Sequence, residues 1–206
     1  MSKQVGHAMT RRRWLLAASA GSLAVAMAAF GWTRWRGIRT DPAQADLCVI
    51  APTHPYDPAS GLSPRAARPV PADARCPVCG MYPARNLRWA AQVIYTDDAA
   101  HFFDSPVSLY LFLHDVERYS SGRSAADIAA RWVTDADTGE WIDADRAFHV
   151  HGSDAPGPMR AGNLPAFASA VAARRFAQLR GGRVLPAAAI DRALLLELDN
   201  RGRHAH

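Results

Sequence analysis

The sequence predicts an α+β fold built from two consecutive strand–strand–helix–strand units, with a segment outside the fold at its N-terminus. Apolar alternation typical of strands gives way twice, in the same order, to the apolar spacing of a helix. Each expected helix begins at a proline behind a polar cap, at Pro106 and, 59 residues later, at Pro165. An order of elements that recurs at a fixed distance indicates an internal duplication.

Six short stretches with apolar, β-branched or aromatic residues are expected to be strands. They are residues 89–95, 100–103, 130–134, 140–142, 147–151 and 183–185. The first two are joined across a polar turn and predict a hairpin. The third and fourth are joined by the polar turn at residues 135–139.

Three helices are expected in the same region. Asp104 is interpreted as the cap of the first helix, which Pro106 opens. Asn163 and Pro165 open the second, and Gly181 ends it. Its inward face is predicted from the helical spacing as Ala168, Val171, Ala172, Arg175, Phe176 and Leu179. A final helix is expected over residues 187–199.

Length and composition suit one globular domain with additional segments. The chain has 206 residues, of which 49% are apolar and 21% charged. These values exclude a disordered chain, a polytopic membrane protein and a collagen-like repeat. The net charge of +5 belongs to the N-terminus, because residues 1–40 hold seven basic and no acidic residues. The remaining residues carry 17 basic against 19 acidic groups, so the charge does not indicate nucleic-acid binding.

Residues 1–40 are interpreted as a targeting segment. Consecutive arginines at 11–13 precede an Ala-rich apolar run over residues 15–32, as in a twin-arginine export signal. Eighteen residues at about 1.5 Å each span about 27 Å, close to the minimum for crossing a bilayer. Small residues around 26–28 suit cleavage, whereas Arg34 and Arg36 suit an uncleaved anchor. Both alternatives place the folded part on the periplasmic side of the inner membrane.

Residues 41–75 are expected to be an extended linker. This stretch contains seven of the fourteen prolines and no clear hydrophobic period. Cys48 lies within it without the small preceding residues of a lipidation site, so it is interpreted as an incidental thiol or a disulfide partner. The folded domain is then predicted over residues 76–190, and residues 191–206 form a C-terminal helix with a histidine-containing tail.

Soft metal ligands gather in one short loop. Cys76, Cys79 and Met81 lie within six residues, and Gly80 allows the backbone to turn tightly between the last two. Met159 closes a second Gly/Pro loop, where a thioether is poorly explained as a core gap-filler. Soft sulfur ligands select Cu(I) over hard cations. The loop is therefore predicted to bind Cu(I).

Two histidines add nitrogen ligands to this prediction. His149 and His151 lie two apart on an expected strand, so both side chains point to one face. Seven residues separate them from Met159. An outward polar strand face explains the pair equally well. The predicted ligands, in one site or two, are Cys76, Cys79, Met81, His149, His151 and Met159.

Other chemistries leave different signatures. A structural zinc site needs two further ligands, and no second Cys-x-x-Cys is present. A redox dithiol at Cys76 and Cys79 stays open, although glycine and proline after the second cysteine disfavour the helix that such motifs open. No hydrolase or phosphate-binding signature occurs. Asp104 is interpreted as a helix cap rather than a catalytic group, and the protein is expected not to be an enzyme.

Five motifs in order resemble the NosL family of exported copper-binding accessory proteins for nitrous oxide reductase maturation. They are Cys-Pro-Val-Cys-Gly-Met-Tyr-Pro-Ala at 76–84, Trp-Ala-Ala-Gln at 89–92, Phe-Phe-Asp-Ser-Pro at 102–106, Gly-Ser-x-x-x-Gly-Pro-Met at 152–159 and Phe-Ala-x-x-x-Gly-Gly-x-Val at 176–184. The resemblance covers residues 76–190.

The resemblance implies a monomeric Cu(I) carrier with the duplicated fold also known from organomercurial lyase. It implies nitrous oxide reductase, or its ABC-type maturation transporter, as the partner, and Met159 as the best ligand candidate. Many family members carry a lipidated N-terminal cysteine, which this chain replaces with a twin-arginine-like segment. Alternatives are copper delivery to another exported copper enzyme, a thiol–disulfide oxidoreductase, and an organomercurial-lyase-like enzyme that rests on fold analogy alone.

Overall fold

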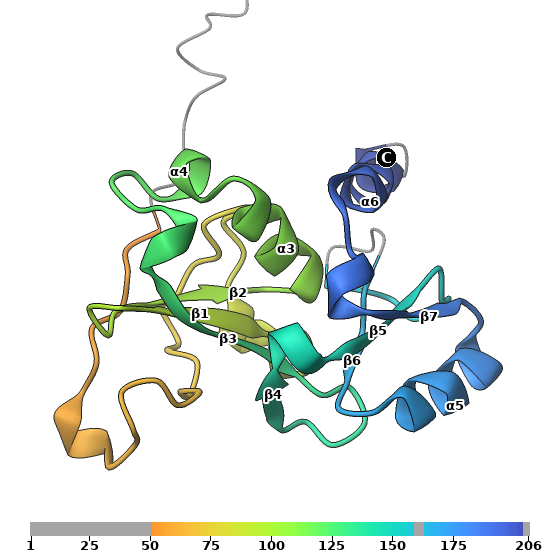
Figure 1. The fold of residues 1–206 in the computed structure, drawn as a ribbon, viewed down its shortest axis with the longest axis horizontal. Coiled ribbons are helices and arrows are strands. Elements are labelled where there is room, and N and C mark those ends of the chain that lie inside the picture. The colour runs from red at the N-terminus through yellow and green to blue at the C-terminus, as the bar shows by residue number, and fades with distance from the viewer. Residues whose placement is uncertain (1–50, 159–162, 204–206) are drawn as a thin grey trace, which may run out of the picture. The chain divides into compact units, whose positions relative to one another are not determined.

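The computed structural model describes residues 51–158 and 163–203, which form two antiparallel sheets with helices packed against them (Figure 1). The expected targeting segment, Cys48 and Met159 lie outside the described residues. Among the residues that are described, no helix is both long and apolar enough to cross a bilayer. The fold of mixed helices and antiparallel sheets agrees with the α+β class.

The first sheet contains four strands in the order β2-β1-β3-β4. They are β1 (Ala91–Tyr95), β2 (Ala100–Phe103), β3 (Ile128–Thr134) and β4 (Trp141–Asp143). Val93 of β1 lies opposite His101 of β2 and Arg131 of β3. The predicted hairpin is confirmed, but β1 begins two residues later than expected. Leu87–Trp89 forms a 3-10 turn (η3) instead, closed by a 3.1 Å bond from Ala90 N to Leu87 O.

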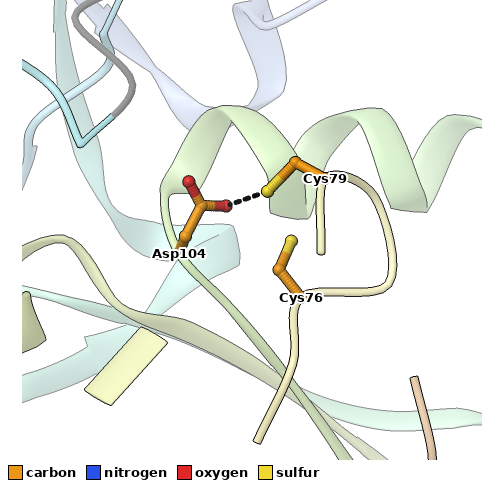
Figure 2. Close-up of side chains that lie close together, drawn as sticks. All are labelled: Cys76, Cys79 and Asp104. Atoms are coloured by element: carbon orange, nitrogen blue, oxygen red, sulfur yellow. Dashed lines mark hydrogen bonds between the residues drawn. The ribbon is translucent and has the colours of Figure 1, made fainter. Parts of the chain in front are cut away.

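The first helical segment comprises α3 (Pro106–His114) and the short α4 (Val116–Tyr119). Its cap is Ser105, whose hydroxyl accepts a 3.2 Å bond from Ser108 N. The prediction that Asp104 caps this helix is therefore wrong. Proline occupies the first helical position, so the residue directly before it is the cap. Asp104 is buried and points to Cys79 instead (Figure 2).

All five residues of β1 are buried, because the sheet is covered on both faces. Leu109 and Phe112 of α3 share one core cluster with alternate residues of β1. The opposite face meets residues 51–75: Val70 and Ala74 pack with Ile94 and Phe102. The alternation predicted for this strand is typical of one buried face, whereas both faces of β1 are buried.

Residues 51–75 are part of the folded domain, contrary to the expected linker. His54 forms an isolated antiparallel bridge with Ala100, with bonds of 2.9 and 2.8 Å. The backbone N and O of Arg68 each bond the buried side-chain amide of Gln92 at 3.0 Å. Prolines fix an extended backbone and offer no N–H groups, so such a segment covers a sheet without a hydrophobic period.

The second sheet contains β5 (Phe148–His151), β6 (Ala166–Phe167) and β7 (Arg183–Pro186) in the order β6-β5-β7. The central strand β5 pairs antiparallel with both neighbours, as β1 pairs with β2 and β3 in the first sheet. In chain order, each sheet thus has a helix between its second and third strands, α3 in the first sheet and α5 (Ala170–Arg180) in the second. The internal duplication itself stays a prediction.

The start of the second helix was predicted wrongly, and its inward face was predicted only in part, since Ala172 and Phe176 pack against the core. Pro165 precedes β6, and α5 is capped by Ser169, whose hydroxyl accepts from Ala172 N at 3.2 Å. Val171 and Leu179, expected inside, are 69% and 78% exposed. The inward face includes Ala173 and the partly buried Ala177 instead, one residue beyond Ala172 and Phe176. The predicted end at Gly181 is confirmed, with φ of 72°.

The C-terminal helix belongs to the core as well. Residues Ala187–Ala189 form a 3-10 turn (η6), and α6 (Arg192–Arg203) follows it, so the expected helix over 187–199 is interrupted. Asp191 caps α6 by accepting a 2.9 Å bond from Leu194 N. Leu195 is fully buried in a cluster with Tyr110 of α3. Contact between α3 and α6 therefore joins the end of the chain to the first unit.

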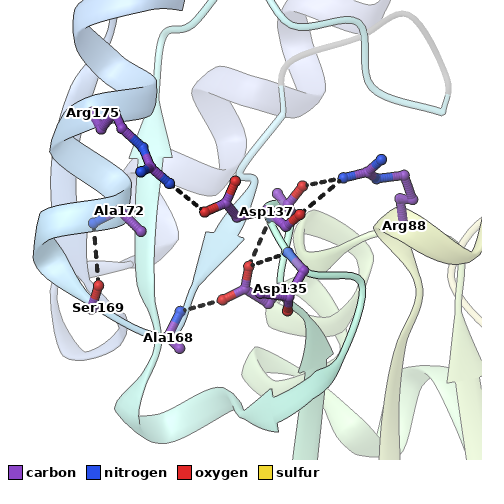
Figure 3. A network of polar contacts seen from close by, with 9 residues as sticks. Arg88, Asp135, Asp137, Ala168, Ser169, Ala172 and Arg175 are labelled. Atoms are coloured by element: carbon purple, nitrogen blue, oxygen red, sulfur yellow. Dashed lines mark hydrogen bonds and ion pairs between the residues drawn. The ribbon is translucent and has the colours of Figure 1, made fainter.

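Asp135 connects the two sheets at the turn between β3 and β4 (Figure 3). Its Oδ1 accepts bonds from the backbone N of Asp137 and Thr138 at 2.8 and 3.1 Å. Its Oδ2 accepts a 2.7 Å bond from Ala168 N, directly after β6. The residue is 3% exposed, so the carboxylate that accepts these three bonds is buried.

The Asp135→Ala substitution is expected to lower the free energy of unfolding by about 3 kcal/mol, because it removes a buried charged acceptor from three N–H groups. Urea unfolding measures the change. The matched control is Asp137→Ala, whose exposed carboxylate makes a 2.5 Å ion pair with Arg175 and whose loss costs less than about 1 kcal/mol. Equal losses in the two variants would contradict the role given to Asp135.

Candidate metal centre

A closed loop over residues 76–81 holds the two cysteines. Cys76 N donates to Met81 O and Gly80 N donates to Cys76 O, both at 2.8 Å. Gly80 has a φ of 73°, in the left-handed region that favours glycine. The tight turn predicted at Gly80 is confirmed. No helix follows Cys76, which distinguishes the loop from a dithiol at a helix N-terminus.

Two free thiols and a carboxylate form one cluster (Figure 2). Single ligand atoms of Cys76, Cys79 and Asp104 all lie within 4.8 Å of one another. The Cys79 thiol donates to Asp104 Oδ1 at 3.1 Å. Asp104 Oδ2 is buried and has no hydrogen-bond partner among the described residues. Cys76 is fully buried and Cys79 half-buried, so solvent reaches the cluster from the side of Cys79.

The first turn of α3 holds the carboxylate in place. Ser108 Oγ donates to Asp104 Oδ1 at 2.7 Å and lies 4.0 Å from Cys79 Sγ. Ser105 Oγ in turn lies 3.2 Å from Ser108 Oγ. The N-terminus of a helix stabilises negative charge, which suits the carboxylate of Asp104 directly before the cap of α3. The cluster is therefore positioned by the hairpin β1–β2, which delivers Asp104, and by the loop, which delivers the thiols.

The surroundings of Cys79 raise the pKa of its thiol. The hydrogen bond with Cys76 raises the pKa of Cys79 most, burial raises it next, and the charge of Asp104 adds to both. A protonated thiol is a poor nucleophile and oxidises slowly. A soft metal ion reverses this balance, because the thiolate is the metal-binding form and metal binding releases the proton.

The two predicted methionine ligands are placed unequally. Met81 closes the loop through its backbone oxygen, and its side chain is 36% exposed beside the cysteines in the chain. Met159 lies outside the described residues. The ligand assignment of both methionines stays a prediction.

The structure does not bring the predicted histidines to the cysteines. His149 and His151 lie on β5 of the second sheet, and the cluster of described ligand atoms includes neither. His149 Nδ1 donates to Leu164 O at 3.1 Å, and its Nε2 accepts from Tyr110 Oη at 2.9 Å. Both ring nitrogens are thus engaged within the core. Burial lowers the pKa of His149 to about 4. Both imidazoles are buried, contrary to the alternative of an outward polar face.

A sequence profile of the NosL family matches residues 67–195, well over half of the chain. The chain belongs to the NosL family. The match begins upstream of the predicted domain boundary at residue 76, consistent with the packing of residues 51–75 in this NosL domain. The resemblance drawn from the five motifs is thereby confirmed. No curated protein matches the chain.

Two solved NosL structures are similar to this chain. The crystal structure of the copper chaperone NosL from Shewanella denitrificans is 22% identical, and the alignment covers 64% of this chain and 99% of that one. Its TM-score of 0.53 shows a shared fold. The solution structure of apo-NosL from Achromobacter cycloclastes is 28% identical over 51% of this chain and 87% of that one, with a TM-score of 0.38.

Asp104 is the site residue that sequence reasoning missed. The segment Asp104-Ser105-Pro106 offers two adjacent residues that are able to cap a helix. Proline prefers the first helical position, which makes Ser105 the cap and leaves the aspartate without a local role. That preference was the available signal. The contact with Cys79, 25 residues away, is not visible in the sequence.

Proposed function

We propose that this NosL protein is an exported Cu(I)-binding metallochaperone that delivers copper for assembly of nitrous oxide reductase. The observation that carries the proposal is the cluster of two free thiols, of which Cys76 is buried and Cys79 is half-buried. Thiolates are the ligands that Cu(I) prefers. The fold shared with a copper chaperone supports the same role.

The arrangement suits transfer rather than storage. Cys76 is the buried anchor of the metal, and the half-buried Cys79 is the ligand that an incoming protein ligand replaces. Asp104 and Ser108 hold the side chain of Cys79 through hydrogen bonds, which fixes the site before the metal arrives. The thioethers of Met81 and Met159 supply further soft ligands that need no deprotonation.

A thiol–disulfide oxidoreductase is the alternative that the geometry disfavours. Reactive cysteines have a lowered pKa and lie at a helix N-terminus or beside a cation. Here the pKa of Cys79 is raised, its thiol contacts the carboxylate of Asp104, and Cys76 is fully buried. These features disfavour a reactive dithiol at Cys76 and Cys79.

The location and the partners are proposed from the sequence. Residues 1–40 direct the chain to the periplasmic side of the inner membrane, as a cleaved signal or as an anchor. The ABC-type maturation transporter or the reductase itself then exchanges copper with the loop. The common strand order of the two sheets supports an origin by duplication of one strand–strand–helix–strand unit.

An anaerobic Cu(I) titration against a chromophoric chelator tests the proposal, with Met159→Leu and Met81→Leu as the variants. The wild-type protein is expected to compete for one Cu(I). Loss of a thioether ligand is expected to weaken binding on the order of tenfold, or about 1.4 kcal/mol. A wild-type protein that withdraws no Cu(I) from the chelator would reject the chaperone and favour the dithiol. Unchanged affinity in both variants would contradict ligation by the two thioethers but would leave the chaperone proposal intact.

A further inference from the structure

The segment around the cysteine loop at residues 76–81 is basic, whereas residues 41–206 as a whole are slightly acidic. Residues 74–96 contain three arginines and no aspartate or glutamate, whereas residues 41–206 carry two more acidic than basic groups. Arg75 directly precedes Cys76, and Arg85 follows Met81 by four positions. The positive charge is therefore concentrated at the ends of the loop that holds the thiols.

The side chains of these arginines are held in fixed positions. The guanidinium carbons of Arg75 and Arg85 lie 4.5 and 4.8 Å from the centroid of the Tyr82 ring. Arg75 also donates to the Tyr82 hydroxyl. Ion pairs between described side chains involve other arginines, namely Arg123, Arg131, Arg175 and Arg180. Two exposed cations on one ring thus have no carboxylate to neutralise them among the described residues.

Exposed apolar side chains accompany these charges in the same segment. Met81 is 36% exposed and Leu87 is 54% exposed, and both belong to the same short segment. We define the basic docking surface as Arg75, Met81, Tyr82, Arg85 and Leu87. Aromatic, methionine and arginine side chains are the types enriched where proteins bind one another.

We propose that the basic docking surface binds an acidic face of the protein that exchanges copper with Cys79. This inference rests on the proposed function. An acidic partner face relieves the repulsion between the two stacked guanidinium groups and steers the encounter toward the loop. The surface directly adjoins the thiols in the chain, so a partner docked here brings its own metal ligand to the half-buried Cys79.

A membrane surface fits the same features less well. Two apolar side chains provide little area to insert into a bilayer, and interfacial segments use a continuous apolar face. Stacking on Tyr82 also holds the arginines in a fixed geometry, which suits the bidentate recognition of carboxylates. We therefore expect no binding to anionic lipid through this surface, and the experiment below includes a test for it.

Photo-crosslinking in the native host tests the docking surface. The photoreactive residue p-benzoylphenylalanine replaces Leu87 in the full chain. The control carries the same residue in place of Leu179 on α5, and Leu179 is 78% exposed. The Leu87 probe is expected to crosslink to an acidic segment of one protein. Arg75→Glu with Arg85→Glu is expected to reduce the yield at least about fivefold. The control pair Arg174→Glu with Arg183→Glu carries the same charge change on the second unit and is expected to change it less than about twofold.

A Leu87 crosslink that is absent, or that survives the charge reversal unchanged, would overturn the proposal. Binding to a membrane would also overturn it. In that case the protein floats with phosphatidylglycerol vesicles, the flotation depends on Arg75 and Arg85, and no protein is crosslinked. The neutral pair Arg75→Gln with Arg85→Gln repeats the test if charge reversal prevents folding. Chelator titration of each variant separates the two proposals. A protein that binds no Cu(I) but still gives the charge-dependent crosslink refutes the chaperone, and the surface then binds an acidic partner without a role in copper exchange.

Discussion

Cys76→Ser combined with Cys79→Ser is expected to lower Cu(I) affinity at least about a thousandfold, or about 4 kcal/mol. Serine replaces both soft thiolates with hydroxyls, which are hard and stay protonated at neutral pH. Competition with a chromophoric chelator under anaerobic conditions measures the loss. Thermal unfolding of the metal-free variant shows whether the fold survives, since Cys76 is fully buried in the core.

The third cysteine provides the matched control. Cys48→Ser makes the same chemical change outside the loop and is expected to leave Cu(I) affinity unchanged within about twofold. If Cys48→Ser abolished binding while the double variant retained it, the metal would belong to the N-terminal segment and not to the cluster with Asp104.

The second large effect concerns acid stability. Burial lowers the pKa values of His101 and His149 from 6.5 to about 4 in the folded protein. Between these values the unfolded chain binds more protons than the folded one, so the free energy of unfolding falls as the pH drops from about 6.5 to about 4. Each imidazole contributes up to about 3 kcal/mol to this loss. Urea unfolding at several pH values across this range measures it.

A single variant isolates the contribution of His149 to this pH dependence. In His149→Gln the amide is able to donate to Leu164 O and accept from Tyr110, so the hydrogen bonds persist without a titrating ring. The slope of unfolding free energy against pH is expected to decrease by about half in this window. His114→Gln, at the exposed end of α3, is the control and is expected to keep the wild-type slope. Identical slopes in all three proteins would contradict a neutral, buried His149.

Local patterns predicted the first sheet well and the second helix poorly. The strand at Ala100–Phe103 and the helix beginning at Pro106 were predicted to the residue, because hairpin and cap signals lie within a few positions of each other. Asn163-Leu164-Pro165 has the same local form but precedes β6. Pairing of Ala166 with His149 of β5 decides that outcome, and a local signature does not contain it.

The linker prediction failed for a related reason. Prolines signal an extended backbone, but they do not tell whether that backbone is solvated or covers a sheet. The bonds between Arg68 and Gln92 join residues 24 positions apart and involve a glutamine that is buried despite its polar side chain. Packing of this kind depends on tertiary contacts, which composition does not reveal.

The candidate site was predicted where its ligands are close in the chain. Cys76 and Cys79 share one turn, and the spacing with Gly80 is enough to place them together. Asp104 joins the site only because it directly follows β2 of the β1–β2 hairpin, which places it beside Cys79. The alternation that puts His149 and His151 on one strand face is real, but it does not show what packs on that face, which is Tyr110 and the chain at Leu164 for His149.

X-ray absorption at the copper edge of the Cu(I)-loaded protein tests the central claim most directly. The account predicts a first shell dominated by sulfur, with two thiolate ligands that disappear in the Cys76→Ser, Cys79→Ser variant while the Cys48→Ser spectrum matches wild type. A first shell of nitrogen and oxygen, or a sulfur shell that persists without Cys76 and Cys79, would contradict it.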